Sequence, residues 1–340
     1  MDYHQIRTDL PVLLLYNLDR QWPLEEITGY LETTWTLRDA LQREGHPVSE
    51  ICLESEEIPS LLNQYDPDQY VVFNWCEELP QVPRSSAFVA QALEALGFVF
   101  TGADSQALAF SQDKRLVKQR LHSHGIPTPQ WRVYTSASSH GWDRFPAIVK
   151  PAFEHCSFGV TRDAVVRSAA ELAKRVDYVL ETFSQPALVE EFIDGREFHV
   201  TVIGNGTLHA LPPAEMDFSA FGDVKDRLCT YESKFDAQSA PYNLIELRLP
   251  APLAEQEQRA LEAAALEAYR ATDCRDYARL DIRLRDGVFY VLDVNPNADI
   301  GPDTSLALAA EMAGLSYGKL GSLLVNLAAQ RHRVYRSLPQ

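Results

Sequence analysis

The first hundred positions alternate between short apolar runs and longer amphipathic stretches. Pro11 to Leu18, Tyr70 to Trp75 and Phe98 to Gly102 are mostly apolar, which is typical of buried parallel strands. Between them, Glu25 to Glu44 and Ser86 to Leu96 repeat apolar residues at a helical spacing and are predicted to be helices. Strands that alternate with helices predict an α/β domain with a mostly parallel sheet.

The pattern changes beyond about position 107. Ser111 is the predicted N-cap of a helix that runs to His124. Longer strand patterns then follow, in AIVKPA, ALVEEFI, EFHVTVIGNG and TLHALPPAEM. Glu255 to Ala271 and 318–333 are predicted helices. The chain is therefore expected to contain an α/β domain and two α+β subdomains, at 1–107, 108–203 and 204–340.

The segment from Asp276 to Asn297 predicts a β-hairpin with charged residues inside otherwise buried strands. Asp293 interrupts an apolar run, and a buried charge is costly unless it is paired or binds a metal. Arg285-Asp286-Gly287 suits a three-residue loop, because glycine adopts a positive φ without strain. This loop would place Arg279 opposite Asp293.

Side chains of a strand alternate between its two faces, so this hairpin gathers four polar side chains. Arg279, Asp281, Asp293 and Asn295 are expected to share one face. Three oxygen-bearing side chains beside an arginine predict a site for Mg²⁺ and phosphate. The alternative is a salt-bridged hairpin with one solvated face.

The composition narrows the class of protein. A chain of 340 residues with 46% hydrophobic residues is expected to be globular, with more than one core. Its formal charge of −17 argues against general binding to nucleic acid or an anionic membrane, because both need a basic surface. The five cysteines include no C-x-x-C pair, and the opening segment lacks the basic region of a signal peptide. A cytoplasmic protein with reduced thiols is expected.

Two lysines are candidates for binding phosphate. Lys114 lies near the start of the helix predicted from Ser111, where a surface lysine is the ordinary interpretation. Lys150 ends an apolar strand directly before a proline, where an unpaired buried ammonium would be penalised. Two lysines from different elements suit the α- and β-phosphates of a nucleotide.

Other segments could complete a nucleotide site. Glu154 to Thr161 combines small residues, including Ser157, with one glycine, and such a loop can close its N–H groups over phosphates. Many strand-to-helix turns look similar, however. Glu190, Glu191 and Glu197 follow an apolar strand and could bind adenine and ribose. The alternative for the first two is an ordinary exposed pair of glutamates.

Four motifs occur in an order and spacing that resembles the ATP-grasp superfamily, and within it the D-alanine–D-alanine ligases. They are QDKRLVKQRLHSHGIPTP, FPAIVKPA, LVEEFIDGREFHV and YARLDIRLRDGVFYVLDVNPN. The resemblance extends from about Phe98 to Tyr317. It implies an ATP-grasp fold, in which the two α+β subdomains clamp ATP. It also implies two Mg²⁺ ions as cofactors, with Mn²⁺ as an alternative.

The resemblance implies a role for each matching residue. The nucleotide-binding residues would be Lys114 and Lys150 at the phosphates, Ser157 in the loop that covers them, Glu190 and Ile193 at adenine, Glu197 at ribose, and Lys234 at the γ-phosphate. The metal ligands would be Asp281, Asp293 and Asn295. Arg279 would stabilise a tetrahedral intermediate.

The substrate-binding segments depart from the family pattern. Glu26 falls where the family has a glutamate that contacts the substrate amine, but a solvated acid at a helix start is equally expected. Cys156 replaces a serine and Phe235 a tyrosine. Ser305 and Leu306 could supply a hydroxyl and an N–H to the acceptor carboxylate. Asp299 and Asp303 bring negative charge to the same loop, which a second carboxylate would not favour.

These features predict an ATP-dependent ligase that joins a small-molecule carboxylate to an amine through an acyl phosphate and forms a dipeptide or an amino-acid amide. Its substrate pair is expected to differ from two D-alanines. Synthesis of D-alanyl-D-alanine, or of a D-alanine–hydroxy acid product, is the first alternative. A non-catalytic ATP-binding regulatory module is an alternative of another class. Family members are often dimers, so a homodimer is one expectation.

Overall fold

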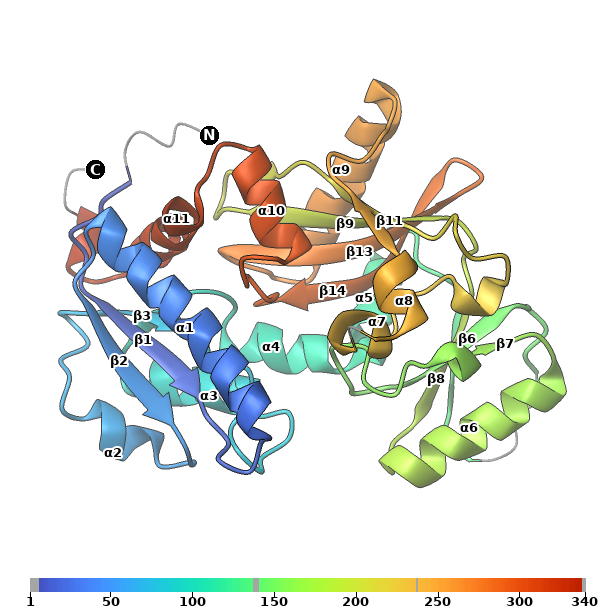
Figure 1. The fold of residues 1–340 in the computed structure, drawn as a ribbon, viewed down its shortest axis with the longest axis horizontal. Coiled ribbons are helices and arrows are strands. Elements are labelled where there is room, and N and C mark those ends of the chain that lie inside the picture. Colours follow the sequence, from blue (N-terminus) through green and yellow to red (C-terminus); the bar gives the residue numbers. More distant parts are fainter. Residues whose placement is uncertain (1–5, 137–140, 237, 338–340) are drawn as a thin grey trace.

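The computed structural model describes residues 6–136, 141–236 and 238–337, which form three sheets with helices packed against them (Figure 1). The N-terminal sheet and the small central sheet lie at opposite sides of the molecule. The third sheet lies between them in the view of Figure 1.

The N-terminal sheet is parallel, as the alternating pattern predicts. Its strand order is β2-β1-β3-β4. The strands are β1 (Val12–Asn17), β2 (Val48–Leu53), β3 (Val71–Asn74) and β4 (Val99–Phe100). The helices of this part are α1 (Leu24–Glu44), α2 (Ile58–Leu62), α3 (Ser86–Ala95) and α4 (Ser105–Gln112). The elements β2, α2 and α4 were not predicted from the sequence.

The last long helix, α11 (Tyr317–Ala329), returns to the N-terminal sheet. It contacts α1, β3 and β4, and its leucines join the core formed by β1 and α1. The C-terminal segment therefore completes the N-terminal core, so the three sequence ranges do not fold as three separate units.

The central sheet is antiparallel, with the order β5-β8-β6-β7, and α6 packs on it. Its elements are β5 (Trp131–Tyr134), β6 (Ala147–Pro151), β7 (Val165–Val166), α6 (Ala169–Phe183) and β8 (Ala187–Glu191). The helix α5 (Lys114–Ser123) precedes it. Asp113, whose side chain accepts from the Arg115 N–H, is the N-cap of α5. The predicted N-cap, Ser111, instead lies within α4.

The third sheet has the order β12-β11-β9-β13-β14, with β10 paired to β9. Its strands are β9 (Arg196–Ile203), β10 (His209–Ala210), β11 (Ala214–Asp217), β12 (Glu246–Arg248), β13 (Tyr277–Arg285) and β14 (Val288–Pro296). Its helices are α7 (Glu232–Phe235), α8 (Ala240–Leu244), α9 (Glu255–Ala271) and α10 (Ser305–Met312). Because β9 belongs here, the central sheet ends before 196 rather than at the expected boundary of 203.

The hairpin β13–β14 has a different register from the predicted one. Its turn has two residues, Asp286 and Gly287, with φ of 53° and 76°, so that Arg285 pairs with Val288. A β-bulge at Leu292 then shifts the pairing by one residue. Arg279 therefore lies opposite Asn295 rather than opposite Asp293. The shared face of the four polar residues is confirmed.

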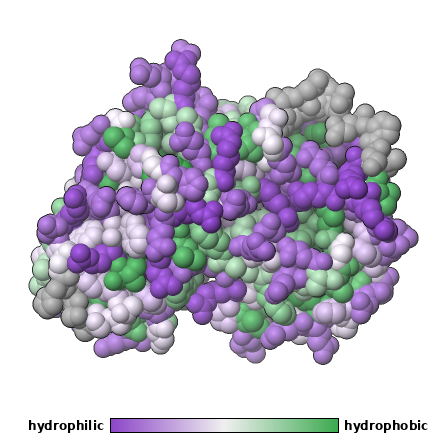
Figure 2. Space-filling model, turned by 180° about the vertical axis from the view of Figure 1, so that it is seen from behind, coloured by the Kyte–Doolittle hydropathy of each residue, from purple (hydrophilic) through white to green (hydrophobic). Residues whose placement is uncertain are grey.

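Hydrophilic residues cover much of the back of the molecule, and hydrophobic residues lie among them in smaller groups (Figure 2). This surface agrees with a composition in which 23% of residues are charged. Within the described residues, no helix combines the length and the apolar character needed to cross a membrane.

Candidate active site

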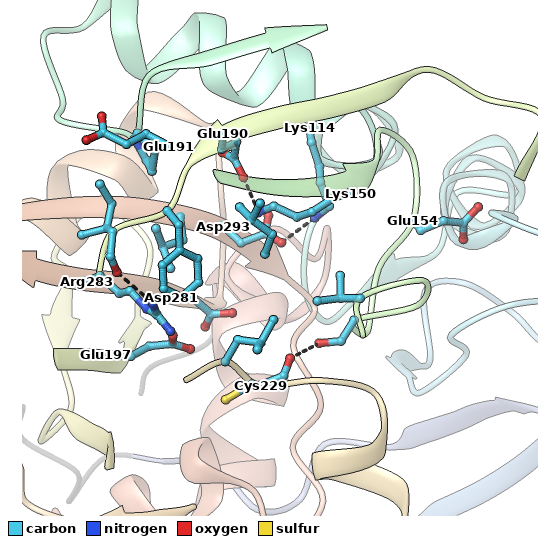
Figure 3. Close-up of a pocket in the computed structure, with 18 of the residues that line it drawn as sticks. Lys114, Lys150, Glu154, Glu190, Glu191, Glu197, Cys229, Asp281, Arg283 and Asp293 are labelled. Carbon is cyan, nitrogen blue, oxygen red and sulfur yellow. Dashed lines mark hydrogen bonds and ion pairs between the residues drawn. The ribbon is translucent and has the colours of Figure 1, made fainter. Parts of the chain in front are cut away.

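A cavity lies between the central sheet and the hairpin of the third sheet (Figure 3). Residues of β6, β8, β9, β13 and β14 line it, together with the loop after β6. Both α+β subdomains therefore contribute walls to one site. The charged residues of the lining are Lys114, Lys150, Glu154, Glu190, Glu191, Glu197, Asp281, Arg283 and Asp293.

Asp281 and Asp293 lie directly opposite one another on β13 and β14. The Lys114 Nζ donates to Asp293 Oδ2 at 2.5 Å. Burial alone would raise the pKa of Asp293, but Lys114 and Lys150 outweigh it and hold the pKa below its usual range. The structure thus brings together in the cavity the acid and the lysine that the sequence marked on separate segments.

Asp281 has its own cationic partner. The Arg279 Nε donates to Asp281 Oδ1 at 2.7 Å, and the Asn295 Nδ2 donates to Asp281 Oδ2 at 3.1 Å. Burial would raise the pKa of Asp281, but Arg279 and His199 together hold it below its usual value. Arg279 and Asn295 are not among the cavity-lining residues and reach the site through Asp281.

The carboxylate of Glu190 lies between two lysines and is 1% exposed. Its Oε1 lies 2.6 Å from the Lys118 Nζ, and its Oε2 pairs with Lys150. Burial would raise the pKa of Glu190, but the two ammonium groups hold it below its usual value. Glu190 lines the cavity and its carboxylate positions Lys118 and Lys150, while its contact with adenine stays a prediction.

Lys118 was not predicted as a site residue, although its spacing from Lys114 is a signal in the sequence. Lys114 and Lys118 are four residues apart on α5, so they lie on one helix face. The Lys118 Nζ also donates to Thr128 Oγ1 and to the carbonyl oxygen of Leu292, both at 2.8 Å. Lys118 therefore ties the central sheet to the bulge of the hairpin.

Glu197 lies at the other end of the cavity and is held by Arg283. The Arg283 Nε donates to Glu197 Oε2 at 2.7 Å, and the Arg283 NH1 group donates to the carbonyl oxygen of Ile193 at 2.8 Å. Burial would raise the pKa of Glu197, and Arg283 lowers it below its usual range. Arg283 was missed, although strand alternation places it on the face of Arg279 and Asp281.

His199 and Cys229 also face this end of the cavity and were not predicted. Alternation along β9 puts His199 on the same face as Glu197, which is the signal that could have found it. No sequence pattern marks Cys229, which lies on the loop before α7. The Ser157 Oγ donates to the Cys229 carbonyl oxygen at 3.0 Å, so the phosphate-covering loop contacts this segment.

The remaining predicted nucleotide contacts lie at the rim. Ser157 lines the cavity, whereas Cys156, the preceding residue, is exposed and is not part of the lining. Glu191 pairs with Arg285 at 2.8 Å and points away from the charged group around Asp293 (Figure 3). Ile193 lines the cavity with 1% of its surface exposed.

The predicted substrate contacts are more scattered. The Ser305 Oγ lies 3.1 Å from His199 Nδ1, which brings the acceptor loop to the cavity. The Leu306 side chain is fully buried in the N-terminal core, so only its main chain could contact a ligand. Glu26 is exposed in the first turn of α1 and does not line the cavity. The side chains of Lys234 and Phe235 lie outside the described part of the structure.

The chain shares its fold with a solved D-alanine–D-alanine ligase from Bacillus anthracis complexed with ATP. The TM-score is 0.73 at 20% identity, and the match covers 95% of this chain and 99% of the other. Residues 121–326 match the model of the family described as D-ala D-ala ligase C-terminus.

Two curated relatives extend over most of the chain. The D-alanine–D-alanine ligase of Aquifex aeolicus is 29% identical over 87% of this chain and 94% of its own length. A Sinorhizobium fredii protein, Uncharacterized protein y4sG, is 32% identical over 86% of each. The fold and the site define an ATP-grasp enzyme. Within that class, the chain belongs to the D-alanine–D-alanine ligase family of ADP-forming ligases.

Proposed function

We propose that this protein joins a carboxylate to an amine at the expense of ATP, through an acyl phosphate, and that its substrates are not two D-alanines. One observation supports the chemistry most directly. Asp281 and Asp293 face one another across two strands, each beside a cation, at a cavity between two subdomains. A solvated hairpin face would not need this arrangement of paired, partly buried charges.

ATP would lie along the cavity. Lys114 and Lys150 supply positive charge for the phosphates, and Ser157 lies on the loop that would close over them. At the other end, Ile148, Phe192 and Leu292 give apolar walls for adenine, with main-chain groups of the 191–193 segment beside them. Glu197, fixed by Arg283, is the acceptor for ribose hydroxyls.

The residues present fit a bound magnesium ion. Asp281 and Asp293 offer carboxylate oxygens and Asn295 an amide oxygen, and Mg²⁺ prefers such oxygen ligands. Each acid raises the electrostatic cost of ionising its neighbour, so a cation between them would be favourable. When bound, one or two Mg²⁺ ions, or Mn²⁺, would neutralise charge that develops on the transferred phosphoryl group.

The reaction divides into two transfers. A substrate carboxylate oxygen attacks the γ-phosphorus, the bond to the β-γ bridging oxygen breaks, and ADP leaves with an acyl phosphate formed. The amine of the second substrate attacks the acyl carbon, loses a proton, and phosphate leaves as the amide forms. Arg279 would stabilise the oxyanion of the tetrahedral intermediate, because its charge is fixed beside Asp281.

The acceptor side of the site is acidic, which supports a different substrate pair. In the loop before α10, the Asp299 and Asp303 side chains both lie beside Gly301, whose N–H donates to Asp299 Oδ1 at 2.7 Å. Burial, followed by Asp299 and Asp303, raises the pKa of Tyr317, in agreement with negative charge gathered there. A free acceptor carboxylate would be repelled there, whereas a neutral or cationic acceptor would be favoured.

The test is ATP-dependent phosphate release with a panel of D- and L-amino acids, hydroxy acids, amines and diamines, followed by mass spectrometry of the products. The proposal expects release stimulated by a pair whose acceptor lacks a free carboxylate, with the matching amide in the spectrum. Strongest stimulation by D-alanine alone, or by D-alanine with a hydroxy acid, would refute the substrate assignment. Tight ATP binding without stimulated release by any pair would refute ligase activity and favour the regulatory module.

A further inference from the structure

Three side chains of different chemistry meet at the Glu197 end of the cavity. Glu197 and His199 point from the same face of β9, and Cys229 approaches from the loop before α7. One ligand atom of each side chain lies within 4.8 Å of the others. Glu197 and His199 are 6% and 9% exposed, so the group is largely withdrawn from solvent.

We propose that Glu197, His199 and Cys229 form a binding site for a borderline-soft divalent cation of the Zn²⁺ class. Oxygen, nitrogen and sulfur donors together are the ligand set of zinc sites, whereas Mg²⁺ selects oxygen donors alone. Ligand atoms of a tetrahedral zinc ion lie about 3.5 Å apart, given bond lengths of about 2.0–2.3 Å. The His199 Nε2 is already 3.8 Å from Glu197 Oε1, so small side-chain movements would close the site.

The neighbours of these ligands orient them toward a common centre. Arg283 binds Glu197 Oε2, which leaves Oε1 on the side of His199. The His199 Nδ1 contacts the Ser305 Oγ at 3.1 Å. When Nδ1–H donates there, the lone pair of Nε2 faces Glu197 Oε1 and Asp281 Oδ1, each 3.8 Å away. Ligating histidines are typically held in this way by a hydrogen bond from the other ring nitrogen.

The cation would be held by the thiolate form of Cys229, since the thiolate rather than the thiol is the metal ligand. Binding of the cation releases the thiol proton to solvent. Water can take the fourth position, because Cys229 is only half-buried and the cavity is open there.

Occupation of this site would exclude nucleotide, because both ligands require Glu197. This competition rests on the proposed function, in which Glu197 accepts hydrogen bonds from ribose hydroxyls. The metal site itself does not depend on the proposed function. A cation of the zinc class would then inhibit the enzyme in competition with ATP, while Mg²⁺ at Asp281 and Asp293 would support it.

Cobalt(II) is the probe for this site, since it occupies zinc sites and gives a thiolate charge-transfer band. The full chain, free of nucleotide and in excess Mg²⁺, is titrated with Co²⁺. We expect this band to saturate at one ion per chain and to be lost in Cys229→Ser. His199→Ala should weaken cobalt binding by at least about 100-fold, because mutating even a residue that only hydrogen-bonds to a metal ligand lowers metal affinity by about 10- to 100-fold. The control Cys156→Ser removes an exposed thiol outside the site and should keep the band.

Absence of the band in the wild-type protein overturns the proposal without any need for a variant, and so does a band that survives in Cys229→Ser. Thermal unfolding of each variant without metal shows whether it is folded. Adenosine, which has ribose hydroxyls but no phosphate to chelate the ion, should weaken cobalt binding in wild type. A normal cobalt band that adenosine does not affect would refute the exclusion of nucleotide and leave the metal site standing.

Discussion

Asp281 and Asp293 face each other across β13 and β14, and each is paired with a cation from a different part of the chain. Lys114 reaches Asp293 from α5, and Arg279 reaches Asp281 from two residues earlier on its own strand. Two partly buried acids at paired strand positions oppose each other's ionisation unless positive charge lies beside them. This face of the hairpin therefore favours bound cations, and Lys114 and Arg279 already supply part of the positive charge.

Lys118 is expected to be essential for the stability of the central part of the site. Lys118→Met leaves the buried Glu190 with one partner fewer, and breaking a buried ion pair costs about 3–5 kcal/mol. Urea unfolding should show this loss, while the exposed control Lys174→Met should change stability by less than about 0.5 kcal/mol. Adding Glu190→Gln to Lys118→Met should recover part of the loss, and failure to do so would contradict the pairing.

Glu197 should contribute to the pH dependence of stability. Its pKa in the folded state is depressed, so the stability it provides is present above its unfolded pKa and is lost as pH falls below about 4.5. Glu197→Gln removes this pH-dependent contribution. Between pH 6 and pH 3, the free energy of unfolding of the variant should therefore fall by about 2 kcal/mol less than that of the wild-type protein. Urea unfolding across this range measures the difference.

The matched control for that prediction is Glu267→Gln, because Glu267 is exposed on α9. It should leave the pH profile of the wild-type protein unchanged. If Glu197→Gln follows the wild-type profile as closely as this control does, the ion pair with Arg283 does not hold the carboxylate in its charged form.

Arg279 is expected to act on the transition state rather than on nucleotide binding. Arg279→Lys keeps a positive charge near Asp281 but loses the two-pronged contact. We expect kcat to fall by about 10²–10³-fold while the KM for ATP stays close to that of wild type. Arg285→Lys, which alters a cation at the cavity rim, is the control. A raised KM with unchanged kcat would place Arg279 in nucleotide binding instead.

The alternation of side chains along each strand made the polar face of the hairpin predictable. The pairing register of its two strands, however, depended on contacts with residues far away in the sequence. Arg279, Asp281, Asp293 and Asn295 share a face because side chains alternate along each strand. The bulge at Leu292 escaped prediction, because its carbonyl oxygen is used by Lys118 of α5, far away in the sequence. A short-range pattern does not contain that contact.

The same reasoning explains the other differences. Glu190 was expected to face adenine because it ends a strand, and its burial between Lys118 and Lys150 is visible only once α5, β6 and β8 are assembled. The packing of α11 on the N-terminal core likewise depends on contacts between segments far apart in the sequence, which a local pattern does not predict. The contacts of Glu26 and Phe235 with substrates, the contact of Lys234 with the γ-phosphate, the homodimer and the cytoplasmic location stay predictions.

The central claim is that Asp281 and Asp293 hold the cations that allow phosphoryl transfer. Its most direct test is substrate-stimulated, Mg²⁺-dependent phosphate release by Asp281→Asn and Asp293→Asn, compared with Asp286→Asn, which alters an exposed acid in the turn of the same hairpin. We expect each of the first two changes to reduce the rate by at least about 10²-fold, and the turn variant to retain the wild-type rate. Wild-type rates in Asp281→Asn and Asp293→Asn would contradict the account.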